Sequence, residues 1–112
     1  MNKRIPGFQP SRSRAALRNG QAYIVSTASD TSQSMYGQTR QALDALDADL
    51  AALGLGRENI LMTTVYIADM SQKPEMNRAW DEWASRDHPP VRACIGGVLE
   101  PGFLVEMVTA CA

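Results

Sequence analysis

Two charged residues stand in stretches near the C-terminus that otherwise have the composition of buried strands. Arg92 lies within "VRACIG" and Glu106 within "FLVEMV". Removing the water around an ion is costly unless a partner compensates the charge, so both residues need an explanation. An arginine can bind a carboxylate through two parallel hydrogen bonds, and a glutamate beside it can act as a base. These two residues are therefore the first candidates for chemistry.

The residues alone leave three interpretations of this pair open. Glu106 could form a buried ion pair with Arg92 and take part in no chemistry. Arg92 could instead face a cleft and bind an anion through its planar guanidinium, with Glu106 as a nearby base. Glu106 could also be exposed at the edge of a strand. Each interpretation places the two strands differently with respect to solvent.

Three smaller side chains are further candidates. Cys94 shares a strand face with Arg92, because side chains alternate along a strand, so it is either a small core residue or part of a site. The hydroxyls of Ser26 and Thr27, at the end of an expected strand, could orient a ligand or bond to the adjacent loop. The one histidine, His88, and the two cysteines lack the spacing of a zinc site, so no metal site is expected.

Length and composition limit the class of protein. With 112 residues, of which 45% are apolar and 21% charged, the chain is expected to form one globular domain over 1–112. The net charge is −1 and the basic residues form no long block, so no basic patch and no nucleic-acid partner are expected. No apolar run approaches the ~20 residues of a membrane helix. Two cysteines are too few for a secreted disulfide framework, which favours the cytoplasm.

The first half of the chain predicts a hairpin and a helix. Residues 1–12 are polar and contain Pro6, Gly7 and Pro10, so they are expected to form an extended lead-in. Asn-Gly at 19–20 predicts a type I′ turn within a hairpin over 14–27. From Met35, apolar residues recur every three or four positions up to a glycine at 54, which predicts an amphipathic helix with one buried face.

The second half predicts three strands and another helix. Residues 59–68 are apolar at both odd and even positions, so both faces of the strand would be covered, as in a central strand. Pro74 suits the first turn of a helix whose buried stripe includes Trp80 and Trp83. Two strands follow, at about 91–98 and 103–110. The resulting order, β-β-α-β-α-β-β, predicts an α+β sandwich with both helices on one face of the sheet.

The sequence resembles the YjgF-like Rid (reactive intermediate deaminase) family. The family pattern P-x-R-x-C, followed about a dozen residues later by an apolar strand with a glutamate, matches Pro90, Arg92, Cys94 and Glu106. The likeness covers almost the whole chain. It includes "QTRQALDALDADLAALG", "ILMTTVYIADM" and "MNRAWDEW", in which Asn77 stands at a recurring family position.

This resemblance implies a chorismate-mutase-like fold and a homotrimer with clefts between subunits. It also implies cofactor-free hydrolysis of imines, derived from enamines such as 2-aminoacrylate, to 2-keto acids and ammonia. Arg92 would hold the substrate carboxylate, and Glu106 would position and deprotonate water. Cys94 and the Ser26 hydroxyl would line the cleft together with Thr27.

The chain also departs from the family pattern. Ser13 falls near the usual position of a tyrosine, Thr27 stands where a glycine is usual, and the connection "IGGVLEPG" is short. The alternative function is a trimeric protein that binds or senses small carboxylates without catalysis. Family members have also been called endoribonucleases, a function that the acidic balance of this chain disfavours.

Overall fold

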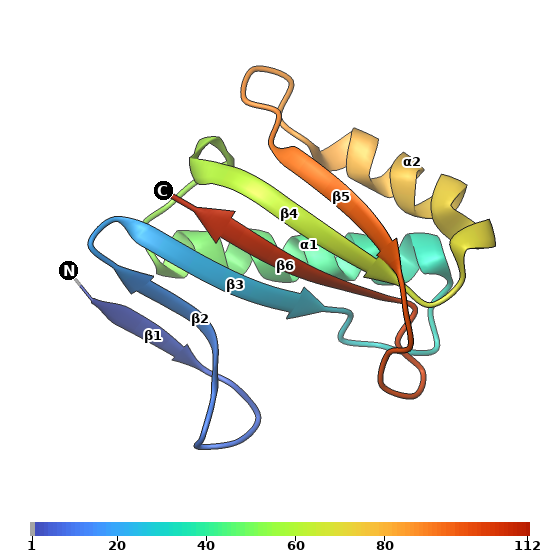
Figure 1. Cartoon of the computed structure of the whole chain (residues 1–112), viewed down its shortest axis with the longest axis horizontal. Coiled ribbons are helices and arrows are strands. Elements are labelled where there is room, and N and C mark those ends of the chain that lie inside the picture. The colour runs from blue at the N-terminus through green and yellow to red at the C-terminus, as the bar shows by residue number, and fades with distance from the viewer. Residues whose placement is uncertain (1) are drawn as a thin grey trace.

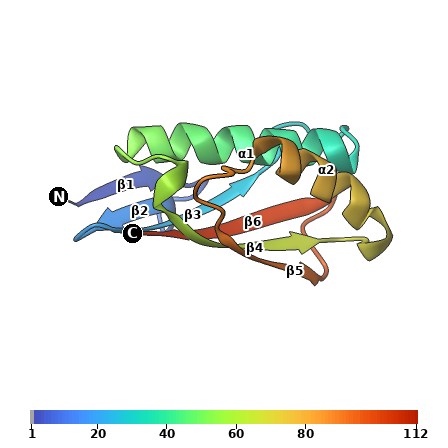
Figure 2. The ribbon, with the colours of Figure 1, turned by 90° about the horizontal axis from the view of Figure 1, so that it is seen from above.

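Six strands form one sheet in the computed structural model, which describes residues 2–112, and both helices cover the same face of it (Figures 1 and 2). The strand order is β1-β2-β3-β6-β4-β5. The strands are β1 Lys3–Pro6, β2 Ser13–Arg18, β3 Gln21–Thr27, β4 Ile60–Ile67, β5 Val91–Gly96 and β6 Val105–Cys111. The helices are α1 Met35–Ala52 and α2 Lys73–Trp83, with short 3-10 helices at Arg57–Asn59 and Met70–Gln72. The predicted α+β arrangement is thus confirmed.

The first strand was not predicted. Residues 1–12 were expected to form an extended lead-in, but Lys3–Pro6 pairs antiparallel with β2. Its four residues are too few and too polar to show an alternating pattern. The strand forms because it pairs with the outer edge of β2, whose backbone groups would otherwise lack partners. Pro6 lies at a register shift near the strand end, where its missing N–H costs little.

The predicted hairpin and first helix are confirmed. Asn19 and Gly20 adopt φ values of 52° and 78°, as the turn between β2 and β3 requires. The Ser34 hydroxyl caps α1 by accepting a hydrogen bond from the Gly37 backbone N–H. Gly54, with a φ of 76°, ends the helix in the left-handed conformation.

The strand β6 lies in the middle of the sheet although it comes last in the chain. It pairs antiparallel with β3 on one side and with β4 on the other. β4 and β5 are parallel and are connected through α2. β5 pairs only with β4 and is therefore an edge strand. This edge carries Arg92, and α2 supplies the side chains that contact it.

A buried glutamine anchors the loops at the start of β6. The Gln38 side-chain NH₂ donates to backbone carbonyls in the 31–33 loop and to that of Gly102, at 3.0–3.3 Å. Its side-chain oxygen accepts a hydrogen bond from the Leu104 N–H at 2.9 Å. These bonds satisfy a fully buried amide and fix the backbone that leads to Glu106.

The sheet face away from the helices, called the open face below, remains uncovered in one chain (Figure 2). It nonetheless carries large apolar side chains: Tyr23, Val25, Met62, Val91 and Ile95 are all exposed. Exposed apolar area of this extent is typical of a contact surface.

None of the helices within residues 2–112 has the length and hydropathy needed to cross a membrane.

Candidate functional site

The guanidinium of Arg92 is half-buried and held by one face of α2. Its Nη2 donates to the Asn77 side-chain oxygen at 2.8 Å, and its Nη1 lies 3.6 Å from the Met76 sulfur. The guanidinium carbon lies 5.4 Å from the centre of the Trp80 ring, a cation–π contact. Trp80 is 6% exposed, so the packing role predicted for it is confirmed and includes this contact.

Arg92 has no carboxylate partner among residues 2–112. The ion pairs in this part of the chain are Arg14–Asp49, Arg40–Glu82 and Arg57–Asp47. No hydrogen bond from the Arg92 Nε occurs there either. Asn77 and Trp80 therefore orient a charge that no anion of the described chain neutralises.

Of the three interpretations, the ion pair between Arg92 and Glu106 is wrong within one chain. Arg92 is in register with Thr63, whose buried side chain faces the helices, whereas Glu106 is in register with Tyr66 on the open face. β4 lies between the two strands, so the side chains point to opposite sides of the sheet from strands about 10 Å apart. The prediction failed because the residues alone do not reveal that β4 separates β5 from β6.

Glu106 lies beside Thr27 on the open face. The two residues are directly opposite each other in the β3–β6 pair, and both are half-buried. Within residues 2–112 the Glu106 carboxylate takes part in no side-chain hydrogen bond or ion pair. Thr27 and Glu106 are thus two adjacent polar side chains on a largely apolar surface.

Cys94 and Ser26 lie on the helix-covered face. Cys94 is half-buried and shares the outward edge of the sheet with Arg92, two residues earlier in β5. Ser26 is 4% exposed, and its hydroxyl lacks a hydrogen-bond partner among the described residues. Two strands separate β3 from β5, so Ser26 and Cys94 are about 14 Å apart within one chain.

The sequence-predicted residues thus fall into separate groups. Arg92 and Cys94 occupy the helix side of the β5 edge, Thr27 and Glu106 occupy the open face, and Ser26 lies under α1. The interactions of Met76 and Asn77 with Arg92 were not predicted. The sequence signals for them were their helical spacing from Trp80 and, for Asn77, its recurring position in the family pattern.

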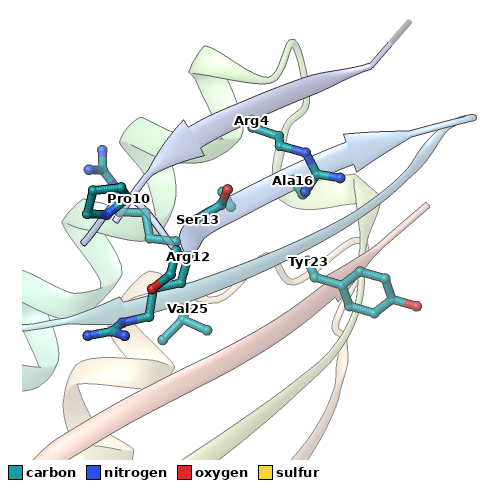
Figure 3. Close-up of a pocket in the computed structure, with 10 residues that line it drawn as sticks. Arg4, Pro10, Arg12, Ser13, Ala16, Tyr23 and Val25 are labelled. Carbon is teal, nitrogen blue, oxygen red and sulfur yellow. The ribbon is translucent and has the colours of Figure 1, made fainter. Parts of the chain in front are cut away.

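The basic residues near the N-terminus come together, contrary to the expectation that no basic patch exists. A hollow of about 380 Å³ lies over β2 and β3 (Figure 3). Its lining includes Arg4, Arg12, Ser13, Tyr23 and Val25. The two arginines are eight residues apart, and the unpredicted pairing of β1 with β2 places both of them beside the hollow.

A family model described as "Endoribonuclease L-PSP" matches residues 13–112. This chain belongs to the YjgF/Rid family. A RutC family protein of Haemophilus ducreyi is 42% identical over 102 residues, which cover 89% of this chain and 87% of that protein.

Solved structures of the YjgF/Rid family share the fold. A YjgF family member from Neisseria meningitidis has a TM-score of 0.92 at 26% identity, covering 100% of this chain and 94% of that one. A protein of unknown function of the conserved Rid family from Yersinia pestis has a TM-score of 0.83 at 25% identity, covering 97% and 93%. The expected chorismate-mutase-like fold is therefore confirmed.

Proposed function

We propose that this protein hydrolyses reactive imines, formed from enamines such as 2-aminoacrylate, to 2-keto acids and ammonia. The observation that carries the proposal is the Arg92 guanidinium, which is held on α2 without a carboxylate partner in the described chain. A fixed, planar cation suits the carboxylate adjacent to a C=N bond, because two parallel hydrogen bonds would also orient the imine carbon.

Glu106 is the proposed base. It takes a proton from water as the oxygen attacks the imine carbon, which gives a tetrahedral carbinolamine. Glu106 returns that proton to nitrogen and then transfers the hydroxyl proton of the carbinolamine to nitrogen as well, so the C–N bond breaks, ammonia leaves and the carbon becomes a ketone. No electrons are gained or lost, and no cofactor is needed. Proton transfer by such a group contributes about 10²–10⁴-fold to the rate.

We further propose that the site forms between copies of this chain in a homotrimer. Arg92 and Glu106 point to opposite sides of one sheet, so a site that contains both needs two chains. The apolar open face supports such a contact, because it would bury Met62, Val91 and Ile95. Contacts of this head-to-tail kind close into rings when the rotation permits.

In this arrangement, Arg92 and Cys94 of one copy face Thr27 and Glu106 of the next. Ser26 lies one residue from Thr27 on the same strand, and its unpartnered hydroxyl is buried on the helix side, away from the open face. A cytoplasmic location belongs to the same proposal. It is supported by Cys94 and Cys111, which are free thiols.

Imine hydrolysis can be measured directly. The imine of pyruvate is generated in situ, the surviving imine is trapped with semicarbazide, and its decay is compared with and without the protein. We expect faster decay with the wild-type protein and background decay with Glu106→Gln. Equal decay with and without the wild-type protein for several imines would exclude the hydrolase.

The second candidate is a protein that binds small carboxylates without catalysis, which the same Arg92 geometry favours. Pyruvate would then raise the melting temperature by mass action while the imine decayed at the background rate. Both candidates therefore predict that pyruvate raises the melting temperature, and only the hydrolase predicts faster decay of the imine.

A further inference from the structure

The charge of this protein is unevenly distributed along the chain. The first 29 residues contain five of its 11 basic residues and none of its 12 acidic residues. The rest of the chain contains six basic and 12 acidic residues. Because these first residues form β1, β2 and β3, the basic charge gathers at one end of the sheet (Figure 1).

The arginines of this end differ in what they contact. Arg14 is held by the buried carboxylate of Asp49, with its Nε and Nη2 at 2.9 and 3.0 Å from the two carboxylate oxygens. Arg4 and Arg12 form no ion pair within residues 2–112. Both line the 380 Å³ hollow, which has no acidic residue in its lining. Figure 3 shows their side chains on either side of Ser13 and Ala16.

The hollow adjoins the Glu106 half of the proposed site. Val25 lies in its lining, and Thr27, the partner of Glu106, is two residues further along the same face of β3. Two residues along a strand correspond to about 7 Å. A short ligand whose reacting carbon lies at Glu106 can therefore extend its other end into the Val25 side of the hollow, where Arg12 lies (Figure 3). Arg4, in register with Ala16 and Tyr23, lies at the far side of the hollow.

We infer that the preferred substrates of this protein are imines with a second acidic group, that is, imines of short dicarboxylic 2-keto acids. This inference rests on the proposed function. The carboxylate next to the C=N bond binds Arg92, and the distal carboxylate binds Arg12 in the hollow, where Arg4 adds positive charge. Hydrolysis follows the same balance: water adds to the carbon, ammonia leaves, and a dicarboxylic keto acid remains.

The size of the preference follows from the exposure of these arginines. Arg4 and Arg12 are exposed, and solvent weakens each of their interactions with a carboxylate. Together they are expected to give a preference of about tenfold in kcat/KM. Salt reduces interactions between exposed charges, so the preference should decrease as ionic strength rises.

The test compares two imines generated in situ, that of pyruvate and that of 2-oxoglutarate. For the wild-type protein we expect kcat/KM about tenfold higher for the dicarboxylic imine. Arg12→Ala and Arg4→Ala should each lower this ratio, and the double variant should bring it close to one. Arg18→Ala is the matched control, since Arg18 is exposed on the same hairpin outside the hollow, and it should keep the ratio.

The outcomes separate this inference from the proposed function. Turnover of both imines with no preference, or with a preference that both arginine variants retain, overturns the inference alone. If neither imine is hydrolysed, the proposed function fails, and the inference is judged by binding of the keto acids. Stronger stabilisation by 2-oxoglutarate than by pyruvate, lost in the double variant, supports it, and equal stabilisation overturns it. A double variant with a lower assembly mass assigns these arginines to a contact between copies and also overturns it.

Discussion

Arg92 and Glu106 lie on opposite faces of the sheet, with β4 between the strands that carry them. Neither side chain forms an ion pair within residues 2–112. Removing either charge therefore leaves no buried partner of opposite sign, and the stability cost of a broken buried ion pair does not arise. A loss of activity on substitution of Arg92 or Glu106 can therefore be assigned mainly to function and not to a loss of stability.

Arg92→Lys should fold with a nearly unchanged melting temperature and lose about 100-fold in imine turnover. Lysine keeps the charge and much of the packing on Trp80 but cannot form two parallel hydrogen bonds or orient the substrate through them. Melting curves and kcat/KM measure the two effects, and Arg78→Lys on the exposed side of α2 serves as the control. A fully active lysine variant would show that two-point recognition is not the role of Arg92.

Asn77→Asp should raise KM by about tenfold or more and leave the fold intact. The substitution changes little in shape, but it places a carboxylate 2.8 Å from the Arg92 Nη2 position, where it competes with the substrate carboxylate. Asn77→Ala removes the hydrogen bond without adding this competitor. Its KM should therefore lie between that of the wild type and that of Asn77→Asp. Asn77→Asp with the wild-type KM would contradict a ligand-facing Arg92.

Val108→Asp should convert the proposed trimer into monomers. Val108 lies between Val25 and Thr64 in the middle of the open face, where a carboxylate buried between copies would lack a partner. Ala48→Asp adds the same charge on the exposed side of α1 and should leave the mass unchanged. Light scattering at micromolar concentration measures both variants. A monomer mass for the wild-type protein would contradict the proposed trimer and any site between copies.

Stability should fall as the pH rises from about 9 to about 11. Burial raises the pKa of the Cys111 thiol from 9.0 to about 11, because the thiolate is poorly solvated in the core. In this range the unfolded chain loses a proton that the folded chain keeps, so the slope is negative and at most about 1.4 kcal/mol per pH unit. The difference in unfolding free energy between wild type and Cys111→Ala, measured by denaturation, isolates this effect. Parallel curves for the two proteins would refute it.

Local patterns were enough to predict most of the fold. The turn at Asn19 and Gly20, the stripe of α1 and the apolar β4 each depend on residues close in sequence. Lys3–Pro6 escaped prediction because its reason for being a strand is the free edge of β2, which its own residues do not encode.

The site was harder to predict because it depends on strand order. Side-chain alternation correctly put Arg92 and Cys94 on one face. Whether β5 and β6 are neighbours is decided by long-range pairing, and β4 separates them. The position of Arg4 and Arg12 beside one hollow depends on the pairing of β1 with β2, which the short, polar β1 did not reveal.

The central position of β6 has a consequence for how this protein is made. During synthesis on a ribosome, β3 and β4 emerge long before the strand that both of them pair with. Until β6 leaves the exit tunnel, the nascent chain has a hairpin and helices but no completed sheet, and the inner edges of β3 and β4 remain free to aggregate. Chaperone demand should therefore be concentrated in the interval just before residues 105–111 emerge.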